Sequence, residues 1–460
     1  MLHQHNNKKL PYPPPSKHYL TPSPDPFFSQ SPALSSALSG KNNWSSDILV
    51  ELVKAIADDS NSSRARQLMC LIIELSSPYG DIDQKLAFYF IQAIFCQLAG
   101  SGPQTYRTLI AASEKTSSFE STRKMLLRFQ EVSPWLTFGH VACNGAIMDA
   151  VEGERRIHII DASNTLCTQW PTLLEAIATR ADDAPHVTIT AVVSQGFSAV
   201  MREIGKRMEK FARLMGVPFG FNIKHLVGDL SDLDFEGLGI RGDETLVVNC
   251  VGSLRVVKSI GGIRNKLISD LGKLKPRVLT IVEESADFGG DDCFGECVRF
   301  YWAYLESLDD CFPMASEERL MLERAAGRAV VDLVASPPEE SEERRDTAAG
   351  WCRRLRSAGF RAAAFGEEVR HDVGALLRRY DRDGWSVGER SDSGGIFLSW
   401  KDEPLVWASA WRPACKPPRQ RLYACPSSSQ LLRVFHLHDA GLDQAFINVA
   451  ESCACASSST

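Results

Sequence analysis

The chain has 460 residues, 44% of them hydrophobic and 23% charged, so most of it can bury the core of one large domain or two ordinary ones. The formal net charge of −6 argues against a protein that coats nucleic acid by bulk positive charge. No apolar run reaches the ~18 residues of a membrane span, and the first residues do not resemble a secretory signal. Thirteen scattered cysteines are typical of reduced thiols, so we expect an intracellular protein of the cytosol or nucleus.

The two ends of the chain differ in composition from the rest. Residues 1–43 contain eight prolines among serines and few branched apolar side chains. Such a segment cannot bury enough surface to offset ~1–2 kcal/mol of backbone entropy per ordered residue, so we predict disorder there. Residues 414–460 begin with a basic stretch and finish in a serine and cysteine tract, and we expect this tail to be poorly ordered as well.

Residues 44–153 carry the apolar spacing of helices, with side chains recurring every three or four positions. The first predicted helix covers 48–56 after a cap at Ser46 or Asp47. Further helices are predicted at 68–75, 83–98, 106–112, 122–131 and 138–151. We interpret this stretch as a helical cap, in which Leu49, Leu52, Leu71 and Phe88 supply core contacts and a partner surface.

From residue 154 to 413, apolar strand-like runs alternate with helical patterns at roughly 30-residue intervals. Strands are predicted at 157–161, 186–193, 221–227, 244–251 and 277–284, and helices at 168 onward, 199–215, 260–274, 294–308 and 317–334. This alternation is typical of a parallel sheet covered on both faces. We therefore predict an α/β fold: a Rossmann-like, mostly parallel sheet with helices on both faces, plus the N-terminal helical cap.

The last part of this region carries signals for helix ends and for a hairpin. Ser316 is the expected cap of the helix at 317–334, and Ser341 that of a further helix that ends before Gly359. Strands at 395–400 and 405–411 are separated by four residues, which predicts an antiparallel hairpin on the edge of the sheet.

Several motifs of nucleotide and metal sites are incomplete in this sequence. Gly237-Leu-Gly239-Ile-Arg-Gly242 matches a dinucleotide-binding string, but the strand follows it instead of preceding it, so we predict a turn. The segment 252–259 lacks the glycine of a phosphate loop at Val257. The cysteine pairs Cys293/Cys297 and Cys453/Cys455 are interpreted as thiols, because no set of ligands with zinc spacing accompanies them.

Two further features bear on a ligand site. The loop after the first predicted strand reads Asp161-Ala-Ser-Asn-Thr-Leu166 and has no glycine, where a cofactor-binding sheet needs one for close approach to backbone. We therefore predict that side chains fill this site and that the chain holds no cofactor. The carboxylates Glu283, Glu284, Asp287, Asp291 and Asp292 could be catalytic, but we favour a solvated acidic loop past a strand end.

Five blocks in order resemble the plant GRAS family over about residues 45–413. The central block is Ile157, His158, Ile159, Ile160 and Asp161, with Gln169, Trp170 and Pro171 downstream. Two leucine-rich stretches flank it, at about 48–130 and 199–240. A fourth block comprises Pro276, Phe300, Tyr301, Arg319 and Glu323, and the closing block comprises Trp351, Gly359, Trp385, Trp400, Ser409, Ala410 and Trp411.

The resemblance implies a methyltransferase-like sheet under a helical cap and a nuclear transcriptional regulator without enzymatic activity. It also implies developmental patterning, such as root radial patterning, carried out with a SCARECROW-like GRAS protein and BIRD-type zinc-finger transcription factors. Contact with DNA would then be indirect. The family-motif residues are the only site residues that we identify: we expect no catalytic, cofactor-binding or metal-binding residue, and no membrane contact.

Two other readings stay open. The order of strands and helices is shared with methyltransferase-like enzymes, so a small-molecule-binding enzyme is an alternative. The arginines Arg353, Arg354, Arg356, Arg378 and Arg379 supply local positive charge for direct DNA contact. Arginines near helix C-termini usually complement the helix dipole, so we favour the reading in which a partner reads the DNA.

Overall fold

The computed structural model describes residues 43–58, 61–163, 165–179, 183–194, 197–258, 261–286, 292–380, 384–390 and 393–414. The stretches 1–42 and 415–460, for which the sequence predicts disorder, lie outside these residues. The chain divides after Trp44, and the fold below is that of the unit that starts at Ser45.

One sheet forms the centre of the fold, and its first five strands are parallel. They are β1 (Arg156–Ser163), β2 (His186–Ser194), β3 (Phe219–Leu226), β4 (Thr245–Val251) and β5 (Val278–Glu284), in the spatial order β3-β2-β1-β4-β5. Their continuous apolar runs suit strands that are buried on both faces. The predicted mostly parallel α/β sheet is thereby confirmed.

Antiparallel strands complete the sheet beyond β5. They are β9 (Glu403–Pro413), β8 (Gly395–Trp400) and β7 (Trp385–Glu389), with β6 (Phe360–Ala363) also pairing with β9. The predicted hairpin of β8 and β9 is present, but its placement on the sheet edge was wrong. β9 pairs with β5 and β7 pairs with the free side of β8, so the hairpin lies inside the sheet.

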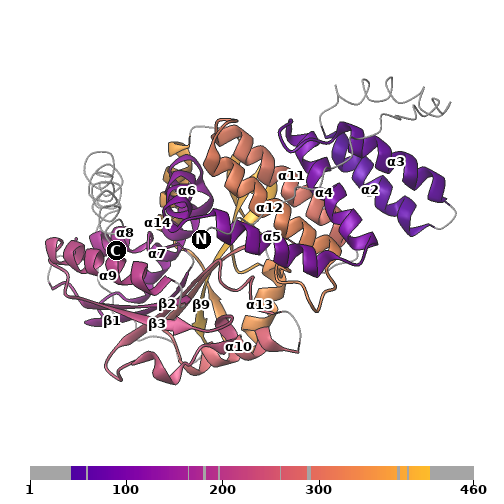
Figure 1. Ribbon diagram of the computed structural model, residues 1–460. Helices are drawn as coiled ribbons and strands as arrows, with labels where there is room; N and C mark the ends of the chain where they lie inside the picture. Colours follow the sequence, from indigo (N-terminus) through magenta and orange to yellow (C-terminus); the bar gives the residue numbers. More distant parts are fainter. Residues whose placement is uncertain are drawn as a thin grey trace, which may run out of the picture. The chain divides into compact units, whose positions relative to one another are not determined.

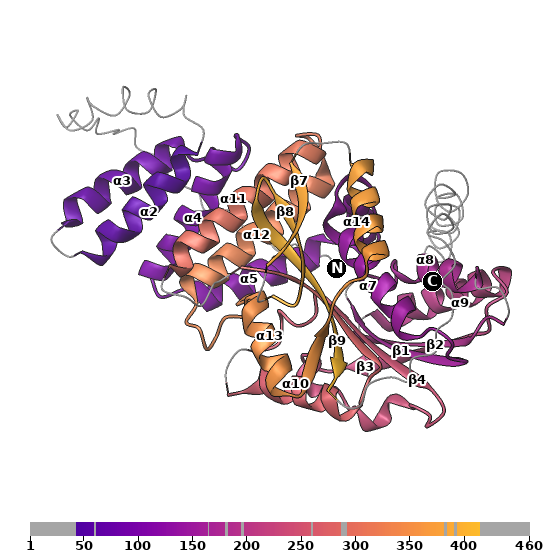
Figure 2. The same cartoon turned by 180° about the vertical axis from the view of Figure 1, so that it is seen from behind.

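Helices cover both faces of this sheet (Figures 1 and 2). On one face, α10 (Ile263–Lys273) and α13 (Ala348–Ser357) pack into a core with Trp407 and Trp411 of β9. On the other face lie α7 (Pro134–Ala150), α8 (Trp170–Ala178), α9 (Ser198–Leu214) and α14 (Glu367–Arg379). At Gly139 of α7 an added Cβ would lie 2.6 Å from Val282 of β5, so only glycine allows this close approach of helix and strand.

A second helical layer lies beside the sheet. It contains α2 (Trp44–Ala57), α3 (Ser62–Leu75), α4 (Ile82–Leu98), α5 (Gly102–Thr116) and α6 (Phe119–Val132), together with α11 (Cys293–Cys311) and α12 (Glu317–Ala335). α12 contacts α4, α5 and α6, and both views place α11 and α12 beside α4 (Figures 1 and 2). The cap is therefore built from helices that precede the parallel strands in the sequence and from two that follow them. The domain division at residue 153 stays a prediction.

Capping side chains explain where several helices begin. Asp81 and Gln84 form a capping box at α4, and Ser133 accepts from Trp135 N–H at α7. Ser316 caps α12 as predicted. The predicted cap at Ser341 was wrong: its hydroxyl donates to Asp332 at 2.6 Å, and α13 starts after Thr347, whose Oγ1 accepts from Gly350 N–H. Two short 3-10 turns, Leu230–Asp232 and Glu236–Leu238, precede β4, which confirms the turn at the glycine string.

Candidate functional site

The central family block is strand β1, the middle of the parallel sheet. Ile157, Ile159 and Ile160 are at most 1% exposed and pack on both faces of the sheet. His158 is equally buried, with Nδ1 2.9 Å from Glu244 Oε2 and Nε2 2.8 Å from Thr190 Oγ1. Burial opposes ionisation of Glu244, but hydrogen bonds from Arg241 N–H and His158 outweigh it and lower its pKa.

Asp161, the last residue of this block, is the centre of a buried polar network. It accepts from Trp170 Nε1 at 2.7 Å and from Asn249 Nδ2 at 3.1 Å. Burial raises the pKa of Asp161 even though these donors favour the ionised form. Asn249 also donates to Gln169 at 3.1 Å, and its own Oδ1 accepts from Thr280 at 2.7 Å. The network ties β1, β4, β5 and the start of α8 together.

Two prolines of the family blocks stand at the beginnings of elements. Pro171 lies in the first turn of α8, where a missing N–H costs nothing. Pro276 is buried immediately before β5. Gly359 follows α13 with φ +84°, a left-handed conformation that favours glycine, so it reverses the chain into β6. These three residues position elements of the fold.

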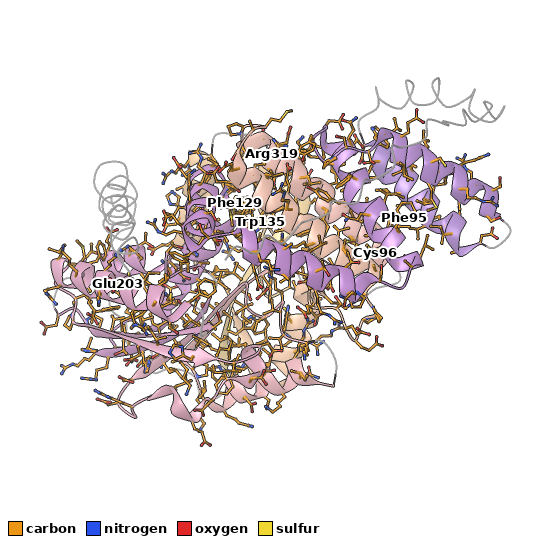
Figure 3. The ribbon with its side chains drawn as sticks, viewed as in Figure 1. Phe95, Cys96, Phe129, Trp135, Glu203 and Arg319 are labelled. Carbon is orange, nitrogen blue, oxygen red and sulfur yellow. The ribbon has the colours of Figure 1, made fainter. Side chains whose placement is uncertain are left out.

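The fourth block supplies aromatic and charged contacts inside the cap. Phe300 and Tyr301 of α11 are buried, and Phe300 meets Trp135 edge-on with ring centroids 6.4 Å apart. Trp135 also lies 6.2 Å from Phe129, and Figure 3 shows both in the centre of the molecule where α6 leads into α7. These rings join the cap helices to the sheet side of the fold.

A buried ion cluster joins α4 to α12. Glu323 Oε1 accepts from Lys85 Nζ at 2.7 Å and from Arg319 Nε at 2.7 Å. Arg319 also reaches Asp309 at 2.6 Å. Lys85, Arg319 and Glu323 are at most 3% exposed, so each charge depends on its partners for compensation.

The closing block lies in the sheet and the helix beneath it. Trp351 of α13 is 1% exposed and has the guanidinium of Arg264 5.4 Å from its ring. Trp385 and Trp400 are cross-strand neighbours with ring centroids 5.0 Å apart. On β9, Ser409, Ala410 and Trp411 are buried, and Trp411 Nε1 donates to Ser409 Oγ at 2.9 Å.

The family-motif residues are therefore mostly buried and hold the fold together. Side chains that are available to partners lie elsewhere. Leu49 and Leu52 are fully buried and Leu71 and Phe88 are partly buried, so the exposed cap side chains are others. On α3, α4 and the turn between them, large apolar side chains are exposed: Ile73 51%, Tyr79 75%, Phe95 42% and Leu98 54%. The spacing of apolar residues predicts that Phe95 and Leu98 lie on the apolar face of a helix, but it does not show whether that face is buried in the core or exposed at the surface.

The ends of the parallel strands border a cavity of about 540 Å³, so the prediction that side chains fill this site was wrong. Asp161 and Ser163 of β1, Ser194 of β2, Val251 of β4 and Glu283 of β5 lie along its floor. Trp170 and Cys167 do contact the Asp161 carboxylate, as the glycine-free loop suggested. The cap helices, however, do not pack directly on this edge of the sheet, and the cavity lies between them.

The predicted acidic loop also needs correction. Glu283 is 2% exposed, and Glu284 pairs with Arg345 at 2.6 Å, so neither is a solvated loop residue; Asp287 and Asp291 lie outside the described residues. Burial raises the pKa of Glu283 to about 7, against the hydrogen bond from Leu254 N–H. The position of Glu283 at the carboxyl end of a predicted parallel strand was the signal that could have identified it, because ligands of parallel sheets bind at that edge.

Among the described residues, no group of three or more His, Cys, Asp or Glu side chains is arranged to hold a metal ion. Cys297 is buried and Cys293 is half-buried, while Cys453 and Cys455 lie outside the described part of the chain. No helix among the described residues is long and apolar enough to cross a membrane. The arginines Arg354, Arg356, Arg378 and Arg379 lie in the last turns of α13 and α14.

The sequence from 45 to 412 matches the model of the GRAS domain family, so the chain belongs to the GRAS family. It is 53% identical over 395 residues to Protein SHORT-ROOT of Arabidopsis thaliana, across 82% of this chain and 74% of that protein. It is also 53% identical to Protein SHORT-ROOT 1 of Oryza sativa subsp. japonica, across 80% of this chain and 68% of the relative. It is thus a SHORT-ROOT-like GRAS protein.

The structure of SCL7 from Oryza sativa is similar in fold, with a TM-score of 0.69 and 25% sequence identity. The similarity covers 80% of this chain and 99% of that one. The family and the SHORT-ROOT relatives together indicate a plant developmental regulator.

Proposed function

We propose that this chain acts in the nucleus as a transcriptional regulator by binding other proteins. Its partners would be a SCARECROW-like GRAS protein, with which it forms a heterodimer, and BIRD-type zinc-finger transcription factors. The process would be developmental patterning, such as root radial patterning. Membership of the GRAS family and the SHORT-ROOT relatives support this proposal.

The observation that carries the heterodimer is a set of exposed apolar side chains along the cap: Phe95 and Leu98 at the C-terminal end of α4, and Ile73 and Tyr79 near its start. A stable interface buries about 1,600 Å² and has a desolvated centre with large apolar anchors. Near Leu98, Gln97 and Gly100 border a groove of about 770 Å³ that could receive side chains of a partner. Figure 3 shows Phe95 and Cys96 at this end of α4, in the helical layer.

DNA sequence would be read by the zinc-finger partner. The chain has a net charge of −6, and the arginine groups noted above lie at helix C-termini, where they complement the helix dipole. Arg354, for example, is already bonded to Asp346 at 2.8 Å. Salt-sensitive, sequence-selective binding of the isolated chain to naked DNA would contradict this part of the proposal.

Co-purification with a SCARECROW-like GRAS protein at micromolar concentration tests the heterodimer. We expect a complex with the wild-type chain and its loss in the double variant Phe95→Asp/Leu98→Asp. Phe197→Asp/Leu214→Asp is the matched control, because these apolar side chains are also exposed, at 44% and 72%, but lie at the ends of α9. Absence of a wild-type complex, or loss with the control pair alone, would contradict the proposed surface.

The enzyme alternative has a direct test. A methyltransferase-like enzyme must bind S-adenosylmethionine, and titration calorimetry of the chain with this compound measures that binding. We expect no heat of binding, because the loop after β1 has no glycine and Asp161 already accepts from Trp170 and Asn249. Binding at micromolar concentration would favour the enzyme.

A further inference from the structure

The cavity of about 540 Å³ lies where the fold usually places a ligand. The strand order β3-β2-β1-β4-β5 reverses direction between β1 and β4, and open α/β sheets bind ligands beyond the carboxyl ends of the strands at such a point. Asp161 and Val251, at the ends of those two strands, both line the cavity. Its volume falls within the roughly 300–1,000 Å³ range of small-molecule sites.

Most of the cavity wall is apolar. α6 contributes Met125, Leu126 and Phe129, and α12 contributes Leu322 and Ala325. Phe300 and Tyr304 of α11 and Val192 of β2 also line it. A wall of this kind favours a ligand with an apolar body, because burial removes hydrocarbon surface from water on both sides.

One part of the lining is charged, but its charges balance. Arg345 pairs with Glu284 at 2.6 Å, and Arg255 lies 3.7 Å from Glu284 and 3.8 Å from Glu343. Glu343 also accepts from Tyr106 at 3.0 Å. Arg328 also lines the cavity, but the whole lining holds four carboxyl side chains (Asp161, Glu283, Glu284 and Glu343) against these three arginines, so it offers little net attraction to a phosphate or carboxylate ligand.

Two polar atoms of the lining remain for a ligand to satisfy. Glu283 Oε1 accepts from Leu254 N–H at 2.6 Å, but Oε2 has no hydrogen-bond partner among the described residues, although the side chain is 2% exposed. Arg328 Nε likewise has no partner within the described part of the chain. A buried carboxyl oxygen without a partner destabilises the fold, and a bound hydrogen-bonding group would relieve that cost.

We infer that this cavity is a binding site for an uncharged, largely apolar small molecule that carries a hydroxyl group. The apolar wall takes the body of the ligand, and the hydroxyl bonds to Glu283 Oε2. Because the cavity lies between the sheet and helices α6, α11 and α12, bound ligand contacts both layers of the protein.

Binding is measured with the full chain and N-phenyl-1-naphthylamine, an uncharged probe that fluoresces in apolar sites. We expect saturable binding to the wild type and at least tenfold weaker binding to Ala325→Phe, which places a ring in the cavity. Ala112→Phe, the same change at an exposed position of α5, should bind like the wild type. Equal affinity of folded Ala325→Phe and wild type, or no saturable binding by the wild type, would overturn the site.

The hydroxyl contact is tested by displacing the probe with three naphthalenes. At about pH 8.5, where the Glu283 carboxyl is ionised and Oε2 can only accept, 2-naphthol should compete for the wild type about tenfold better than 2-methoxynaphthalene, which has no O–H donor. Naphthalene-2-sulfonate should compete worst, because the cavity charges are compensated. In Glu283→Gln, which keeps the size of the side chain and an oxygen for Leu254 N–H, the preference for 2-naphthol should disappear. A preference that survives in this variant, or the strongest competition by the sulfonate, would overturn the ligand class.

Discussion

The sheet and the outer surface of the cap use the same kinds of side chain in opposite ways. On β1, Ile159 is fully buried and Asp161 is bonded to Trp170 and Asn249, so neither side chain is available to a protein partner. On α4, Phe95 and Leu98 are apolar and exposed. The comparison teaches that the most recognisable blocks of the sequence build the scaffold, whereas the surface that we propose for binding to other proteins lies outside them.

The largest effect is expected in the sheet. Ile159→Asp would bury a charge in the central strand at a cost of several kcal/mol, comparable to the 5–15 kcal/mol stability of a whole domain. We expect the variant to be insoluble or to lack a cooperative thermal transition, as followed by circular dichroism. Soluble protein that melts cooperatively would contradict the position of β1.

A buried charge in the cap comes next. Glu323→Gln leaves Lys85 and Arg319 without their shared carboxylate, and removal of one partner from a buried pair costs about 3–5 kcal/mol. Denaturant unfolding measures the loss. Glu203→Gln is the control, because Glu203 pairs with Lys206 on the exposed surface of α9 and its loss should leave stability nearly unchanged (Figure 3). Similar losses in both variants would contradict the assigned burial.

The pKa of Glu283 predicts a pH dependence of stability. Its pKa rises from 4.5 to about 7 on folding, so the protonated form is favoured in the folded state. The stabilisation is therefore complete below the unfolded pKa of 4.5 and is lost as pH rises through about 7, by at most about 3 kcal/mol. The free energy of unfolding of wild type minus that of Glu283→Gln should fall over this range. A difference that is flat or rises with pH would show that Glu283 is not buried.

A smaller effect is expected where α12 crosses α4. At Gly327 an added Cβ would lie 2.4 Å from Tyr89 Cδ1, so Gly327→Ala forces the helices apart at a cost of about 1–3 kcal/mol. Gly242→Ala is the control, since no atom lies within 4 Å of its added Cβ and the backbone of Gly242 is not in the left-handed region. Thermal melting of the two variants measures the difference; equal melting temperatures would contradict the packing of α12 on α4.

Much of the fold could be predicted because local pattern and tertiary position agree. The apolar runs of β1 and β2 are long enough to identify buried parallel strands, and their observed bounds differ from the predicted ones by at most two residues. β6, α14 and β7 were not predicted, because β6 is four residues long and β7 is largely exposed, so neither gives a strong apolar run.

The cavity could not be predicted for a different reason. The absence of glycine from the loop after β1 carries information only about contacts made by that loop. For those contacts the prediction is correct, because Trp170 donates a hydrogen bond to Asp161. Whether space remains depends on how far α6 and α12 stand from the sheet, which no single segment encodes. Glu283 was misassigned for the same reason: an acidic pair at a strand end looks solvated until the covering helices are known.

The most direct test of the central claim is the dissociation constant of the complex with a SCARECROW-like GRAS protein, measured with Phe95→Ser together with the melting temperature of the variant. Phe95 is 42% exposed, so more than half of its ring is buried and its loss should lower the free energy of unfolding by about 1–2 kcal/mol, which leaves the variant folded. The account predicts at least tenfold weaker binding, as for the loss of an anchor residue, while the variant still melts cooperatively. An unchanged dissociation constant in a folded variant would contradict it.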